Sequence, residues 1–434
     1  MSTLAEVKLW ERTIGAVFLA DGDDVATFEY DPAFAQSGIQ VSPLHMPLSQ
    51  NLFSFPALAR ATFHGLPGLL ADTLPDRFGN ALIDAWLASQ GRKASTFNAV
   101  ERLCYTGTRG MGALEFFPTQ GPRERTSHPI DVEELVRLAS DILQQREHVH
   151  AEMADSAVPD PLRDILQVGT SAGGARAKAV IAWNPETQEV RSGQVQADIG
   201  FEHWLLKFDG VSGNRDKELE DPQGYGLIEY AYSLMAKDAG IDMMPCRLLS
   251  ENGRNHFMTK RFDRTAAGEK LHMQSLGAIA HFDFNQAGAY GYEQCMQIMR
   301  QLDMPAASLE QQFRRMAFNI IARNQDDHVK NIAFLMDKQG TWTLAPAFDV
   351  TFSYQPSGDW THAHQMTLQG KRDGFTLEDF KAAGKAVGLV RGRAERIVRE
   401  VQEVVAMWTQ YAEQVGLDDI VQRKIDGNLR RQLV

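Results

Sequence analysis

Cysteine is scarce in this chain. Only three cysteines occur among 434 residues, Cys104, Cys246 and Cys295, and they are too widely scattered to form a paired metal-ligand motif. Neither a disulfide framework nor a zinc site is therefore indicated. A reducing cytoplasm is the compartment that best fits this cysteine usage.

Long apolar runs are missing as well. The sequence contains no stretch of about 18 consecutive apolar residues, so it predicts no membrane-spanning helix. Residues 1–11 carry charges where a signal peptide needs an apolar core. We therefore expect a cytoplasmic protein with no membrane partner.

The chain also lacks an excess of positive charge. The chain has 44 Lys and Arg against 56 Asp and Glu, which gives a formal net charge of -12. Because binding to nucleic-acid phosphates requires a basic face, this balance argues against autonomous attachment to DNA or RNA.

Apolar and aromatic residues are plentiful, at 44% and 9% of the chain, so most of it should fold. Short β-prone runs at residues 7–10, 14–19 and 25–30 predict a small antiparallel meander. Helical and loop segments follow this meander. We expect a first domain of strands and helices over residues 1–122.

Three further units are expected in the rest of the chain. A helix beginning at residue 131, where acidic residues suit the positive end of the helix dipole, belongs to a connecting segment over residues 123–164. β-type runs with one inserted helix predict a sheet over residues 165–263, and helical spacing predominates over residues 264–434. The expected fold class is α+β, with a small β-rich N-terminal domain and a mainly helical C-terminal part.

The most informative polar segment covers residues 324–331 and follows an apolar helix. Asp326 and Asn331 in this segment have the Asp-x-x-x-x-Asn spacing of kinases. Phosphoryl transfer needs a carboxylate to accept the proton of the attacking hydroxyl and an amide oxygen to hold Mg²⁺. Asp349, farther along, stands where kinases place a second metal ligand, although Phe348 precedes it and no Asp-Phe-Gly motif is present.

A glycine-rich stretch precedes the β-type run at residue 179. Its small residues Gly173, Gly174 and Ala175 would let backbone N–H groups approach phosphate oxygens, although the stretch matches neither of the common phosphate-loop patterns. Lys207 is the one Lys in an otherwise apolar run, where it could meet phosphate, and Glu229 on the inserted helix could orient it. A snorkelling edge-strand Lys and a solvated Glu are the simpler alternatives.

In combination these residues resemble the HipA family of Ser/Thr protein kinase toxins. The strongest matches are residues 174–178, Lys207, Glu229, residues 261–264, residues 326–331 and Asp349. The resemblance implies a bilobal protein-kinase-like fold, with residues 165–263 as the N-lobe and residues 264–434 as the helical C-lobe.

The resemblance also implies roles for individual residues. It makes Asp326 the catalytic acid/base and Asn331 and Asp349 the Mg²⁺ ligands. Asp327 stands where the best-known members have Gly, so both acids remain candidates, and the spacing favours Asp326. Binding of ATP is assigned to Gly173, Gly174, Ala175, Arg176, Lys178, Lys207, Glu229, Lys260, Phe262, His328 and Lys330.

Regulation and partners follow from the same resemblance. Ser171 matches the loop serine that family members autophosphorylate. The implied partners are a protein substrate such as an aminoacyl-tRNA synthetase and a HipB-like helix-turn-helix antitoxin, through which most contact with DNA would run, with a dimer as one arrangement within that complex. A kinase for small molecules and a pseudokinase that acts only as an accessory repressor remain alternatives.

Overall fold

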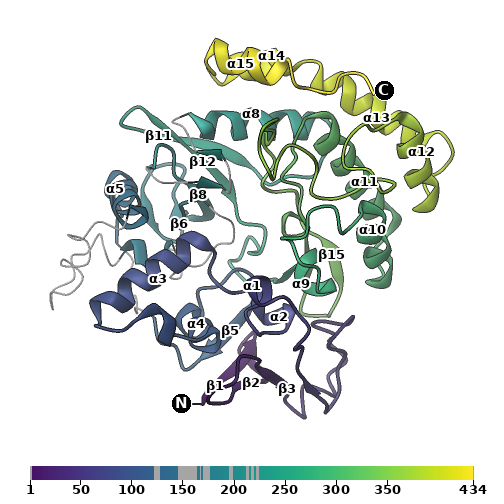
Figure 1. Cartoon of the computed structure of the whole chain (residues 1–434). Coiled ribbons are helices and arrows are strands. Elements are labelled where there is room, and N and C mark those ends of the chain that lie inside the picture. Colours follow the sequence, from purple (N-terminus) through teal and green to yellow (C-terminus); the bar gives the residue numbers. More distant parts are fainter. Residues whose placement is uncertain are drawn as a thin grey trace.

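The structure is a computed structural model that describes residues 2–121, 128–144, 164–166, 168–169, 176–194, 199–211, 215–216, 219–220 and 224–433. The glycine-rich positions Gly173, Gly174 and Ala175 and the serine at position 171 lie outside these ranges. Figure 1 shows the N-terminal sheet at the bottom of the molecule, a second sheet above it, and the C-terminal helices along the top and right.

The N-terminal sheet confirms the predicted meander. Its strands pair antiparallel in the order β4-β3-β2-β1-β5. On β1, Ala5, Val7 and Leu9 are buried while the residues between them are more exposed, as expected for a sheet with one covered face. The strands are β1 (Thr3–Leu9), β2 (Arg12–Leu19), β3 (Thr27–Tyr30), β4 (Leu52–Phe53) and β5 (Leu114–Phe117).

Short helices connect the meander to β5. Helix α4 begins with a capping box in which Asn98 and Glu101 each bind the backbone N–H of the other. The helices of this region are α1 (Arg60–Phe63), α2 (Gly68–Ala71), α3 (Arg77–Ser89), the 3-10 turn η1 (Ala94–Thr96) and α4 (Ala99–Thr106).

The second sheet has the order β11-β12-β8-β6-β7 and is also antiparallel. It falls within residues 165–263, where β-type runs predict a sheet, and α8 is the predicted inserted helix. Its elements are β6 (Lys178–Trp183), β7 (Val190–Ser192), β8 (Glu202–Lys207), α8 (Tyr225–Asp238), β11 (Cys246–Glu251) and β12 (Arg254–Lys260), with the short pair β9 (Arg215–Asp216) and β10 (Leu219–Glu220) forming a separate ribbon.

Two helices cover one face of the second sheet. Trp204 and Leu206 of β8 are buried in one core with residues of α3 and of α5 (Val132–Leu143). Because side chains alternate along a strand, Leu205 and Lys207 face the opposite side, where they line a cavity. The packing of α3 and α5 therefore determines which side chains of this sheet reach the cavity.

The C-terminal part is mainly helical, and a buried stripe on each long helix explains its position. On α13, Ile397, Val398 and Val401 recur at helical spacing and are fully or almost fully buried. The helices are α9 (Leu276–Ala280), α10 (Tyr292–Gln301), α11 (Ala306–Ile321), the 3-10 turn η2 (Val329–Asn331), α12 (Leu377–Ala386), α13 (Arg393–Val405), α14 (Trp408–Gln414) and α15 (Asp419–Asp426).

A three-stranded sheet interrupts this helical region and differs from the expectation for residues 264–434. Its strands are β13 (His272–Ser275), β14 (Ala333–Met336) and β15 (Trp342–Leu344), in that order. β13 and β14 are far apart in sequence and only four residues long, so neither has enough length for a clear periodicity. The α+β class with a β-rich N-terminal region and a helical C-terminal part is confirmed.

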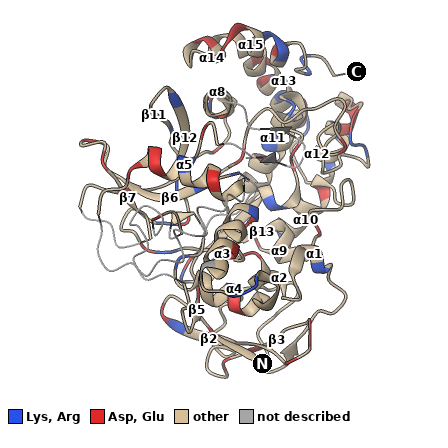
Figure 2. Ribbon diagram, turned by 60° about the vertical axis from the view of Figure 1, so that its left-hand side comes forward, with Lys and Arg blue, Asp and Glu red and all other residues tan. Residues whose placement is uncertain are grey.

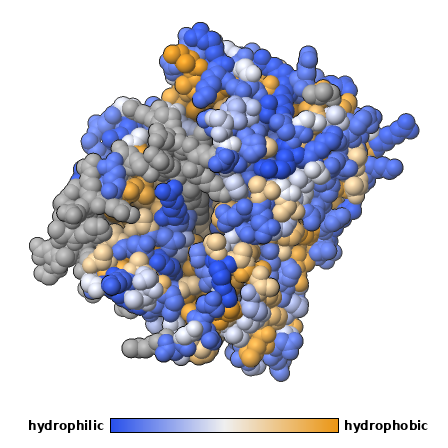
Figure 3. Space-filling view, in the orientation of Figure 1, coloured by the Kyte–Doolittle hydropathy of each residue, from blue (hydrophilic) through white to orange (hydrophobic). Residues whose placement is uncertain are grey.

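The surface is polar and carries both charges. Figure 2 shows acidic and basic segments interspersed over the outer helices. The face in Figure 3 is largely hydrophilic, with more apolar atoms toward the N-terminal sheet. In the part of the chain that the structure describes, no helix combines the length and the apolar character needed to cross a membrane.

Candidate active site

A cavity of about 410 Å³ lies where the N-terminal domain, the second sheet and the segment after α11 meet. Apart from Asp327, the alternative candidate for the catalytic acid, every predicted site residue that the structure describes lines it, although these residues are spread over more than 170 positions of the chain. They are Arg176, Lys178, Lys207, Glu229, Lys260, Phe262, Asp326, His328, Lys330, Asn331 and Asp349.

Lys207 forms the electrostatic centre of this cavity. Its Nζ donates to Oε1 of Glu229 on α8 at 2.5 Å and to Oδ1 of Asp349. Burial alone would lower the pKa of Lys207, but the charges of the two carboxylates raise it above its ordinary value. The ammonium group is therefore held charged and fixed in direction, as a phosphate-binding Lys requires.

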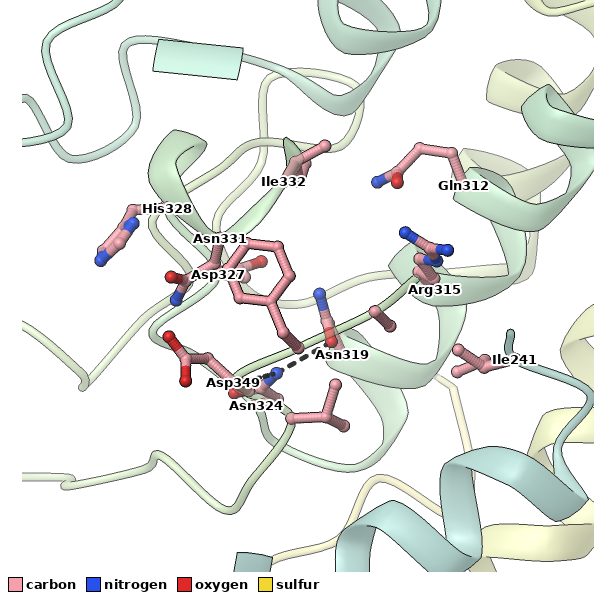
Figure 4. A pocket seen from close by; sticks show the side chains of 13 residues that line it. Ile241, Gln312, Arg315, Asn319, Asn324, Asp327, His328, Asn331, Ile332 and Asp349 are labelled. Carbon is pink, nitrogen blue, oxygen red and sulfur yellow. Dashed lines mark hydrogen bonds between the residues drawn. The ribbon is translucent and has the colours of Figure 1, made fainter. Parts of the chain in front are cut away.

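Asp349 is a partly buried but ionised carboxylate, whose side chain is 29% exposed. Burial by itself would raise its pKa, yet the charges of Lys207 and Lys178 and the hydrogen bond from Lys207 hold the pKa of Asp349 at about 2. Its φ of 51° lies in the left-handed region, which Asp tolerates better than most residues. Asn324 supports this turn because its Nδ2 donates to the backbone oxygen of Asp349 at 3.4 Å and to Oδ1 of Asn319 at 3.0 Å (Figure 4).

The two neighbouring acids after α11 occupy different environments. Asp326 lines the cavity, and its Oδ1 accepts a hydrogen bond from Nε1 of Trp360 at 2.6 Å. Its other oxygen lies 3.9 Å from Nε2 of His328, which also lines the cavity. Asp326 therefore stays our prediction for the catalytic carboxylate.

Asp327 points into the protein and is only 3% exposed. It accepts hydrogen bonds from the hydroxyl of Tyr292 at 2.5 Å and from the backbone N–H of Gln365 at 2.8 Å, and it pairs with Nδ1 of His364 at 2.8 Å. Burial alone would raise the pKa of Asp327, but His364 and these donors lower it. Both carboxylate oxygens of Asp327 therefore bind protein groups, and these contacts hold the segment after α11 in place.

Asn331 and Asp349 could hold a divalent cation between the protein and a triphosphate. Nδ2 of Asn331 donates to the backbone oxygen of Asp326 at 2.8 Å, which leaves Oδ1 as an acceptor, and both Asn331 and Asp349 line the cavity. The same two residues also line a second, separate pocket, whose side chains Figure 4 shows. Among the described residues, no group of three or more His, Cys, Asp or Glu could hold a metal by itself. One carboxylate and one amide fit Mg²⁺, which usually takes its remaining ligands from water and phosphate.

Aromatic and aliphatic side chains form another wall of the cavity. The rings of Phe262 and Phe348 lie 5.5 Å apart between their centroids, and Leu205 and Met273 line the same wall. Lys260 also lines the cavity, but its Nζ pairs with Glu202 at 2.7 Å. The backbone N–H of Lys260 donates to the oxygen of Pro245, so it is already used. An adenine ring would therefore be held mainly by the apolar surfaces.

Family models match both the N-terminal and the C-terminal part of the chain. A model described as the HipA N-terminal domain matches residues 5–117, and one described as the HipA-like C-terminal domain matches residues 170–408, which is more than half of the chain. The chain belongs to the HipA family. The residues that line the cavity thus all lie within the two segments that the HipA models match.

Individual relatives are more distant. A putative kinase of Sinorhizobium fredii, Y4mE, is 28% identical over 187 residues, covering 40% of this chain and 44% of the relative. A putative kinase of Haemophilus influenzae is 25% identical over 254 residues, covering 50% of this chain and 73% of the relative. The match therefore spans less than half the length of the Sinorhizobium protein.

A solved structure shows the same fold along almost the whole chain. HipA of Shewanella oneidensis MR-1, determined in a complex with HipB and operator DNA, has a TM-score of 0.68 and 17% identity. The likeness covers 99% of this chain and 97% of that one. It confirms the bilobal, HipA-type fold predicted from the resemblance.

Several residues of this HipA-family site are not apparent from the sequence. Trp360, Asp72, Asp76, Arg77 and Asn285 all line the cavity. Only Asp76 has a local signal, because an Asp directly before an amphipathic run predicts a helix N-cap, and such a cap carries no indication of a ligand. Their presence in the cavity follows from tertiary contacts.

Proposed function

We propose that this HipA-family chain is an ATP- and Mg²⁺-dependent Ser/Thr protein kinase. The observation that supports this most strongly is the convergence of Asp326, Asn331, Asp349 and the Lys207–Glu229 pair on one cavity. These are the parts that phosphoryl transfer uses, since positioning and electrostatic stabilisation supply most of its catalysis.

Each residue has a role that its contacts allow. Lys207, held by Glu229 and Asp349, neutralises phosphate oxygens. Asn331 and Asp349 would hold Mg²⁺, which would supply positive charge to offset the negative charge of the phosphates. Asp326, held at one oxygen by Trp360, uses the other oxygen to accept the proton of the attacking hydroxyl.

The biological part of the proposal is a toxin of a HipA/HipB-like system. Its support is the family and the likeness to the HipA that was determined with HipB and operator DNA. The proposed partner is a basic helix-turn-helix antitoxin, for which the net charge of -12 is favourable, and DNA contact would run mostly through it. The proposed substrate is a translation component such as an aminoacyl-tRNA synthetase.

Autophosphorylation at Ser171 is the proposed form of regulation. A phosphate carries about two negative charges at neutral pH, and beside the nucleotide it would repel the phosphates of ATP. Modification of this serine is therefore expected to silence the enzyme. Mass spectrometry of the chain after incubation with Mg-ATP would detect the modification.

The test is transfer of labelled γ-phosphate from Mg-ATP to proteins of a bacterial extract, followed by phosphoproteomics. We expect Asp326→Asn to lower the transfer rate by a factor of about 10²–10⁴, the usual contribution of a general base. Glu403→Gln, at an exposed position of α13, is the matched control and should keep full activity. The unfolding midpoint of Asp326→Asn should stay near that of the wild type.

The outcomes separate the alternatives. Label that moves from ATP to another small molecule, and not to protein, would identify a small-molecule kinase. Nucleotide binding with no turnover in the wild type would identify a pseudokinase. Transfer that survives both Asp326→Asn and Asp349→Ala would defeat the assignment of the site.

A further inference from the structure

Two lysines face each other in the wall of the nucleotide cavity. Lys178 of β6 and Lys207 of β8 are direct cross-strand partners, and both side chains line the cavity. They are also largely shielded from water, with exposed side-chain fractions of 3% and 12%. Like charges directly opposite one another destabilise a sheet, so each ammonium group needs a carboxylate nearby.

The carboxylates that meet these lysines come from different parts of the chain. Glu229 and Asp349, which pair with Lys207, both belong to the segment that the C-terminal HipA model matches. Lys178 forms an ion pair with Asp76, whose Oδ2 lies 3.4 Å from Nζ. Asp76 belongs to the N-terminal domain, so that domain contributes a charge to the cavity.

Asp76 is held on a rigid element. It is the N-cap of α3, and its Oδ1 accepts a hydrogen bond from the backbone N–H of Gly79 at 2.7 Å. Phe78 and Leu82 of the same helix are fully buried in the core behind β6 and β8. One oxygen therefore caps the helix while the packing of the helix keeps the other directed at Lys178.

Other contacts of the N-terminal domain surround this pair. Asp72, Thr73, Leu74, Arg77 and Met111 line the same cavity. Asp72 also binds the C-terminal part directly, because it accepts hydrogen bonds from the backbone N–H and hydroxyl of Ser275 at 2.7 and 2.8 Å. The position of Asp76 relative to Lys178 thus depends on how the N-terminal domain is docked.

We propose that Asp76 is a positioning residue of the nucleotide site, which holds Lys178 toward the cavity and makes the docked N-terminal domain a part of that site. The pair repeats, across the sheet, the arrangement of Lys207 with Glu229. Without the Asp76 carboxylate, Lys178 loses the ion pair that directs its ammonium group toward the cavity, and its contact with the phosphates weakens. The inference rests on the proposed function, since it assigns the occupant of the cavity as Mg-ATP.

The experiment measures binding of Mg-ATP to the full chain by calorimetry. Asp76→Asn is the informative variant because Asn also caps helices, so the change removes the charge and keeps the cap. We expect it to weaken binding about tenfold, within the range of coupling between contacting charged groups. Asp84→Asn is the control, because Asp84 lies on the same helix as Asp76 and its side chain is 45% exposed. The change breaks an ion pair with Arg102 of α4, and the affinity for Mg-ATP should stay within about twofold of the wild type.

A double-mutant cycle separates positioning from a general loss of structure. Lys178→Met alone should weaken binding, and adding Asp76→Asn to it should change nothing further, because Asp76 acts through Lys178. The inference would be overturned if Asp76→Asn weakened binding by the same factor in the wild type and in Lys178→Met. Unchanged or tighter binding in Asp76→Asn alone would overturn it as well.

Because the experiment measures binding of Mg-ATP and not phosphate transfer, it can fail or succeed independently of the proposed kinase activity. A wild-type chain that binds Mg-ATP but transfers no phosphate defeats the proposed activity, while the coupling between Asp76 and Lys178 can still be present. A wild-type chain that does not bind the nucleotide overturns both.

Discussion

At the scale of single residues, the site depends on how each carboxylate is held. Trp360 donates to Oδ1 of Asp326 at 2.6 Å, which favours one orientation of the carboxylate. Asp327 next to it is fixed by Tyr292 and His364. The adjacent acids therefore differ in environment, since Asp326 lines the cavity while Asp327 is buried and supports the segment.

Replacing Trp360 tests the role of that hydrogen bond. We expect Trp360→Phe to lower kcat about tenfold, because a hydrogen bond to a charged group contributes roughly 1.5–3 kcal/mol. The KM for ATP should change little, since the indole binds Asp326 and not the Lys207 cluster. Steady-state kinetics of phosphoryl transfer measures both parameters.

Trp342→Phe is a matched control for this change. Its indole also donates to an oxygen, that of Gln40, but at 3.3 Å and outside the cavity. We expect its kcat to stay close to that of the wild type. An unchanged kcat in Trp360→Phe would remove Trp360 from the positioning of Asp326.

At the scale of elements, the segment after β12 joins the domains through a buried charge cluster. Asp263, which is fully buried, pairs with Arg261 and Arg264 at 2.7 Å each and accepts a hydrogen bond from the backbone N–H of Gly112 at 2.7 Å. Burial would raise the pKa of Asp263, but the two guanidinium groups hold it well below its usual range. A link between β12 and the N-terminal domain thus runs through one carboxylate.

Removing this carboxylate should destabilise the fold strongly. Asp263→Ala leaves Arg261 buried without its partner, and breaking a buried ion pair in this way costs about 3–5 kcal/mol. Urea unfolding followed by circular dichroism measures the change in the free energy of unfolding. Glu269→Ala is the comparison, because it breaks an exposed pair with Lys338 and should cost at most about 1 kcal/mol. Similar losses in the two variants would contradict the role of the cluster.

At the scale of the whole molecule, buried histidines link stability to pH. His272 on β13 is fully buried, and burial lowers its pKa to about 4. An unfolded His has a pKa of about 6.5, so between these values the unfolded chain binds more protons and stability falls as the pH falls. Asp76 has the opposite effect, because burial raises its folded pKa to about 6 despite Lys178, and the folded chain then binds the extra proton.

The contribution of His272 can be isolated by comparing variants. From pH 7 to pH 5, His272→Phe should lose about 2 kcal/mol less stability than the wild type, because it removes one group that must stay neutral in the fold. Urea unfolding at each pH gives both free energies. Parallel curves for the two proteins would show that His272 does not contribute to the pH dependence.

Local patterns in the sequence predict the candidate catalytic segment and several of the longer elements. Asp326 and Asn331 are close in sequence, and their spacing indicates kinase chemistry before any contact is known. β1, β2 and α8 follow from periodicity, because each is long enough to repeat an apolar pattern. β13 and β14 were missed because each has four residues and their pairing joins distant segments.

The sequence alone determined the α+β class, the order of the kinase-type residues and the resemblance to the HipA family. Tertiary structure decided which of two adjacent acids faces the cavity, because burial and partners differ while residue type does not. It also placed Asp76 beside Lys178 and Trp360 beside Asp326. These pairs lie about 100 and 34 positions apart, and only the docking of α3 and the fold of the segment after Asp349 bring them together.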